Sequence, residues 1–348
     1  MPRLFSHFAA RRPAFTLIEV LTATAITVFI VLAVLFVTTE TFRAYDGAIA
    51  KLDTITQARA ALVPLQQDLE SAIIRNDGRV WMQVDHLLDT GNVKKGQAPV
   101  LMLFAPVPDR LKRIKEKTDL LPGDVCAIKY RIAQRSPFLP PGEKGSKESM
   151  YLQTYGFYRA IVDAKETFDV ALEGIVEGNR DPLDFWQGSA EVIDSDGNRH
   201  AQSLEEWATG AQNYIASNVV GVTLIFWFLE YGEDENAKPQ LKAFVHMDNM
   251  ASAQTAFQSA GIDVVVEAYN RGLKIKSGQI IVDDNVSESK KRVLKSVDVS
   301  LVILSPSGAK ELRGLQYTEG TVKVRQDKYD KLLEKQGEHF TAKIRFYQ

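Results

Sequence analysis

The sequence contains very little cysteine and histidine, the side chains that build most transition-metal sites and many nucleophilic sites. Of its 348 residues, one is cysteine, Cys126, and five are histidine. A single cysteine excludes a disulfide within the chain and a zinc cluster made of cysteines. The histidines are scattered without metal-ligand spacing: His7, His86, His200, His246 and His339. We therefore expect the histidines to be packing or surface residues, and Cys126 to be a buried, inert thiol in the middle of a strand.

The chain also lacks an excess of charge of either sign. Its 42 basic and 44 acidic residues give a net charge of −2, whereas nucleic-acid-binding domains are typically basic. One short basic run is interrupted by Asp109 and Glu116 and contains no aromatic residue for base stacking, so we interpret it as a solvated helix face. Its members are Arg110, Lys112, Arg113, Lys115 and Lys117.

No linear signature of a catalytic site is present. The chain has no His-Glu-x-x-His, Gly-x-Ser-x-Gly, Walker or dinucleotide-binding glycine motif, so we expect no enzyme activity, catalytic residue or cofactor. One turn alternates oxygen-bearing side chains as calcium loops do, through Asp194, Asp196 and Asn198. We interpret this turn as part of a hairpin, with a calcium site as the alternative.

The most informative feature is a long apolar run near the amino end. Residues 15–37 read FTLIEVLTATAITVFIVLAVLFV and carry one charge, at Glu19. A helix of this length is about 35 Å long, enough to cross a hydrocarbon core of about 30 Å. Residues 1–14 contain three arginines and no acidic residue. By the positive-inside rule, the short amino end stays in the cytoplasm and the rest of the chain is exported.

Glu19 is the residue in this run that needs an explanation. A cleaved secretory signal would have a shorter apolar region of about 7–15 residues, so the run is interpreted as a membrane segment that stays in the chain. A carboxylate in such a segment is costly and is usually paired. The run offers no lysine or arginine, so the partner of Glu19 is expected to come from another chain or from a new amino terminus.

The heptapeptide AFTLIEV at residues 14–20, with a basic leader before it and the apolar run after it, resembles the type IV prepilin signal. The resemblance implies that a prepilin peptidase cleaves between Ala14 and Phe15 and methylates the amine of Phe15. It also implies that Glu19 pairs with the amino terminus of a neighbouring subunit during assembly. The family usually has glycine at the position of Ala14, so this chain departs from the family pattern at the residue before the cut.

Helical periodicity continues beyond the apolar run. Apolar residues recur at three- and four-residue steps: Tyr45, Ile49, Leu52, Ile55, Leu62, Leu65, Leu69 and Ile73. The pattern predicts one helix from near Phe15 to about Ile74, kinked or divided at Pro64. We expect its first half to contact other subunits laterally and its second half to pack on the rest of the chain.

The remainder of the chain is rich in short β-forming runs separated by polar turns. The predicted strands are Val80–Val84, Val100–Ala105, Val125–Ile132, Leu152–Val162, Phe168–Ile175, Val219–Tyr231, Ile262–Tyr269, Gln279–Val282, Val297–Leu304 and Ala342–Tyr347. Val219–Tyr231 is the most continuously apolar and should lie centrally, because it is too short for a second membrane span. The predicted helices are 203–216, which begins with a capping box, a second from Asn249 to about Ser259, and Asp327–Gln336.

These elements predict an α+β protein with a long amino-terminal transmembrane and amphipathic helix and a mainly antiparallel β head. The predicted parts are a leader peptide at 1–14, a transmembrane segment at 15–37, an amphipathic helix at 38–75 and an exported head at 76–348. Residues 57–73 resemble the helix of the type II secretion minor pseudopilin J. Segments 215–220, 296–304 and 333–340 resemble the head of the Verru_Chthon cassette protein C family. Both resemblances imply a minor subunit with a large head.

The favoured hypothesis is therefore a non-enzymatic, single-pass inner-membrane subunit that assembles into a type IV pilus or a type II secretion-like fibre. The resemblance implies four partners: a prepilin peptidase, other pilin subunits, an inner-membrane assembly platform and its ATPase. The alternative is a membrane-tethered adhesin or cargo-binding module, which exposed aromatic clusters around Phe226–Phe228 or Trp207 would favour. A tethered enzyme is the remote alternative, which convergent groups with strongly shifted pKa values would support.

Overall fold

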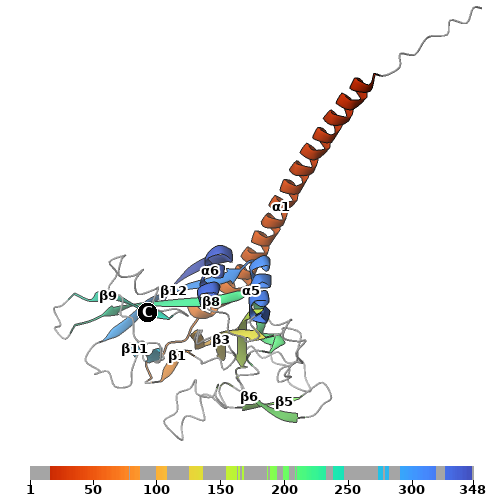
Figure 1. Cartoon of the computed structure of the whole chain (residues 1–348). Helices are drawn as coiled ribbons and strands as arrows, with labels where there is room; N and C mark the ends of the chain where they lie inside the picture. Colours follow the sequence, from red (N-terminus) through yellow and green to blue (C-terminus); the bar gives the residue numbers. More distant parts are fainter. Residues whose placement is uncertain are drawn as a thin grey trace, which may run out of the picture. The chain divides into compact units, whose positions relative to one another are not determined.

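The computed structural model describes residues 16–77, 79–86, 99–107, 125–135, 154–162, 164, 167, 186, 189–193, 199–203, 208, 210–232, 238–246, 273–276, 279–281, 291–318 and 326–346. The chain divides into two units, residues 1–52 and residues 53–348. Most of helix α1 (Leu17–Glu70) belongs to the first unit, and its last turns belong to the second together with all the strands (Figure 1).

Helix α1 runs from Leu17 to Glu70, which confirms the long amino-terminal helix. The predicted division at Pro64 is wrong, because Pro64 lies inside the continuous helix. A proline removes one hydrogen bond from a helix. Here the neighbouring residues Ala61 and Leu65 are fully buried in the core of the second unit, and this burial offsets the missing bond.

The strands of the described residues form one large antiparallel sheet and one separate hairpin. The order in the large sheet is β7-β4-β3-β2-β1-β10-β11-β12-β8-β9, and β13 pairs with β12. Its strands are β1 (Val80–His86), β2 (Pro99–Ala105), β3 (Cys126–Arg135), β4 (Thr154–Val162), β7 (Tyr214–Ser217), β8 (Val219–Glu230), β9 (Gln240–His246), β10 (Leu273–Lys276), β11 (Gln279–Ile281), β12 (Arg292–Leu304) and β13 (Gly337–Arg345). The separate hairpin pairs β5 (Ser189–Ile193) with β6 (Arg199–Ser203). The α+β class is thereby confirmed.

Most of the predicted strands coincide with observed ones, including β8, which lies between β12 and β9 as its apolar character predicts. Phe168–Ile175, Ile262–Tyr269 and the helix expected at Asn249 lie outside the described residues. Helix α6 (Gln326–Gln336) is confirmed. The patterns do not predict helix α5 (Pro306–Thr318), although Pro306 at its first position is a helix-start signal.

The helix predicted over 203–216 does not reach its expected end: Ala208 is helical, residues 204–207 and 209 lie outside the described residues, and the described residues from 210 onward are not α-helical. Ser203 ends strand β6, Ala211–Asn213 forms a single 3-10 turn, and Tyr214–Ser217 is strand β7. Strand β7 pairs with the edge of β4 through Phe157 and Gly156. This pairing with a distant segment outweighs the local helical signal, which consisted of the capping-box pattern and polar spacing.

Strands β7 and β8 are joined by one residue, Asn218, and pair with opposite ends of the strand order. Asn218 has a positive φ of 58°, the left-handed conformation that asparagine tolerates better than most residues. Its N–H donates to the carbonyl of Tyr155 on β4 at 2.7 Å, and its carbonyl accepts from the N–H of Leu304 on β12 at 2.9 Å. The bent β7–β8 segment therefore links β4 to β12 and closes the run of paired strands into a ring.

The main core lies on the inner face of this ring and includes the last turns of α1. Ala58, Ala61, Leu65 and Leu69 share one buried cluster with inward-facing residues of β1, β2, β3, β8 and β12. The two alanines leave room for a close approach of helix and sheet. A second cluster forms on the outer face of β1–β4, and α5 and α6 cover part of β8 and β12 in a third (Figure 1).

We predict that Asn218→Val destabilises the head by about 1–3 kcal/mol, because a β-branched residue is strained at positive φ. Asn218→Gly serves as the matched control, since glycine adopts this conformation freely. The check is urea unfolding of the full chain in mild detergent. Equal unfolding midpoints for the two variants would contradict the role assigned to this conformation.

Candidate functional site

The candidate site lies at the start of helix α1. The expected cleavage residues, Ala14 and Phe15, lie outside the described residues, and the described chain begins at Thr16. Glu19 lies in the first turn of α1. Glu19 therefore lies within one turn of the expected new amino terminus, and its local contacts decide which of its carboxylate oxygens can bind a partner.

Thr16 and Glu19 form a reciprocal capping box. The Oε2 of Glu19 accepts hydrogen bonds from the N–H and from the hydroxyl of Thr16, both at 2.9 Å. The Thr16 Oγ1 accepts from the N–H of Glu19 at 3.3 Å. These bonds satisfy donors that a helix start otherwise leaves unpaired. The Thr-x-x-Glu spacing at residues 16–19 is the sequence signal for this cap.

The capping box uses only one carboxylate oxygen. Within the described residues, no hydrogen bond to the Oε1 of Glu19 is found, so this oxygen is left for a further donor. Glu19 is the only charged residue of segment 16–39. The nearest arginine of the helix, Arg43, pairs with Glu40 at 2.6 Å. Helix α1 therefore supplies Glu19 with a cap but with no cation close in sequence.

The helix that follows Glu19 presents an apolar surface on all sides. Leu17 is 82% exposed, Phe29 is 74% exposed and Phe36 is 67% exposed. The most apolar window of α1 has a mean hydropathy of 2.8 and no buried residue. This helix is long and apolar enough to span a membrane.

The threonine hydroxyls of this segment do not interrupt its apolar character. Those of Thr22, Thr27 and Thr38 donate to backbone carbonyls one turn earlier, at 3.0, 2.8 and 2.7 Å. A hydroxyl that is hydrogen-bonded within its own helix avoids most of the cost of entering an apolar environment. The segment is thus suited to contact lipid or other apolar helices.

A second polar site fixes the end of α1 to the sheet. Asp68, 3% exposed, accepts from the Nε and Nη2 of Arg159 on β4, both at 2.7 Å. The hydroxyl of Tyr130 on β3 donates to the Oδ2 of Asp68 at 2.5 Å. Burial, and next the negative charge of Asp68, raise the pKa of Tyr130 well above its ordinary value. The bidentate geometry makes this a directional lock between helix and sheet.

We predict that Asp68→Asn destabilises the head by about 3–5 kcal/mol, because it leaves the buried guanidinium of Arg159 without its counter-charge. The check is urea unfolding of the full chain in mild detergent, with tryptophan fluorescence as the signal that monitors unfolding. Glu70→Gln, two residues away on the exposed side of α1, is the matched control and should shift the midpoint little. A comparable shift in both variants would contradict the lock.

Lys129 lies on the other face of β3 and is 3% exposed. Its Nζ is 5.4 Å from the centre of the Trp186 ring. Burial, and next the charge of Arg131, lower the pKa of Lys129 to about 7, while Asp85 acts in the opposite direction. A buried amine with a shifted pKa can take part in chemistry. However, among the described residues no group of His, Cys, Asp and Glu could hold a metal ion beside it.

We predict that Lys129→Met raises the stability of the head at pH 7. In the unfolded chain Lys129 keeps its ordinary pKa near 10.5, so between about pH 7 and 10.5 the unfolded state binds the extra proton. The stability of the parent chain therefore rises with pH across this window, and the difference in stability between the parent chain and the variant becomes smaller. Thermal unfolding at pH 7, 8 and 9 checks this, with the exposed Lys276→Met as the control. A gap that stays constant or widens with pH would contradict the shifted pKa.

The other predicted residues fall in three groups. The calcium candidate Asp194, Asp196 and Asn198, the basic run at 110–117, and Trp207 lie outside the described residues. Cys126 is buried, as predicted, but it begins β3 rather than lying in its middle. Phe226 and Phe228 are completely buried, so they form no exposed aromatic cluster. They point inward because β8 contributes alternate residues to the core of the ring.

Comparison with known proteins gives no match: no family model, no curated protein and no solved structure is similar to this chain.

Proposed function

We propose that this protein is a structural, prepilin-like subunit that assembles into a fibre through its amino-terminal helix. The single observation that carries the proposal is Glu19, a lone carboxylate at the first turn of a fully exposed, otherwise uncharged helical segment. A membrane-embedded carboxylate is stabilised only by a partner. Cleavage before Phe15 would create a cationic amine one residue before Thr16, whose N–H and hydroxyl donate hydrogen bonds to Glu19.

The capping box is compatible with this role. Oε2 of Glu19 is engaged by Thr16, and Oε1 is left to accept a donor from a second subunit. One carboxylate can thus hold its own helix start and an incoming amine together. The apolar helix surface would then be covered by equivalent helices, which replaces lipid contacts by helix packing.

The orientation proposed for the chain follows from the arginines of residues 1–14. They keep the leader in the cytoplasm, within reach of a prepilin peptidase, and the head is exported. An inner-membrane assembly platform and its ATPase would extract the processed subunit. In this arrangement the protein is a minor, large-headed subunit of a type IV pilus or a type II secretion-like fibre.

The joint between α1 and the sheet supports a structural role for the head. Asp68 and Arg159 bind in bidentate geometry, and α1 contributes to the main core. The last turns of α1 are therefore an integral part of the folded head.

The test is expression of the full chain with an active prepilin peptidase, followed by mass spectrometry of the mature amino terminus. The expected product begins at N-methylated Phe15. Ala14→Gly restores the residue that the family usually has and should be processed at least as completely. Ala14→Leu should block cleavage, because a large side chain replaces the small residue. An intact Met1 start with an active control substrate would overturn the proposal and indicate a static membrane anchor.

We further predict that Glu19→Gln is processed normally but assembles at least tenfold less, because an amide cannot form the charge-assisted bond to the amine. Thr16→Ser, which retains the cap, is the control. Assembly is measured as the chain recovered in sheared, sedimentable material, with processing checked on the same samples. Normal assembly of Glu19→Gln would contradict the role given to this carboxylate.

A further inference from the structure

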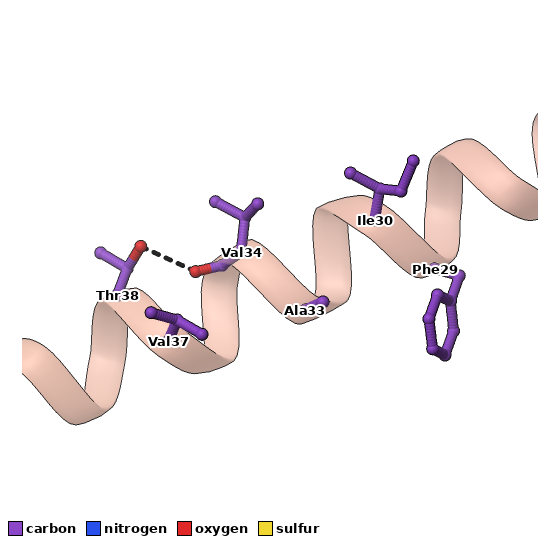
Figure 2. Close-up of a pocket in the computed structure, with 6 residues that line it drawn as sticks. All are labelled: Phe29, Ile30, Ala33, Val34, Val37 and Thr38. Carbon is purple, nitrogen blue, oxygen red and sulfur yellow. Dashed lines mark hydrogen bonds between the residues drawn. The ribbon is translucent and has the colours of Figure 1, made fainter.

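We draw no further inference here: the strongest candidate, the apolar notch on the exposed segment of helix α1 that is lined by Phe29, Ile30, Ala33, Val34, Val37 and Thr38 (Figure 2), belongs to an apolar helix face, and nothing in the structure shows what covers that face.

Discussion

Burial of one stripe of the last turns of α1 against the inner face of the strands is the interaction on which the head depends. The inner face of the sheet is apolar in β1, β2, β3, β8 and β12, and it needs an apolar partner that is long and narrow. Helix α1 is this partner. Its small residues Ala58 and Ala61 let the helix backbone approach the sheet closely, and its larger residues Leu65 and Leu69 fill the remaining space of the core. Asp68 then fixes the rotation of the helix, because a bidentate pair with Arg159 tolerates little change in angle.

The two sections of α1 show how one helix can serve two environments. Up to Val37 its side chains are apolar in every direction, and its hydroxyls are bonded to its own backbone. From Thr54 onward only one stripe is apolar, and that stripe is buried.

Local patterns in the sequence were sufficient for the longest elements, but not for helix α5, for strands β9 and β10, or for the long-range contacts. The periodicity of α1 and the β-branched run of β8 predict these elements correctly, because each signal is long and lies within one segment. The helix expected at 203–216 does not extend to Ala216, because Tyr214 and Ala216 pair with residues of β4, which no local rule reveals. The pair of Asp68 and Arg159 is separated by 91 residues and follows only from the strand order. In the candidate site, Glu19 is recognisable from the sequence as the one charged residue of the apolar run, and its Thr16 cap is recognisable from the Thr-x-x-Glu spacing.

The closing bond between Asn218 and Leu304 has a consequence for the way the chain reaches its final form. Strands β4 and β12 are joined through residues that lie far apart in sequence, and the core also includes Ile344 near the carboxyl end. Contacts of such high sequence separation form late and slowly. A chain synthesised from its amino end therefore covers the inner stripe of α1 in two stages, first with β1, β2 and β3 and last with β8, β12 and β13.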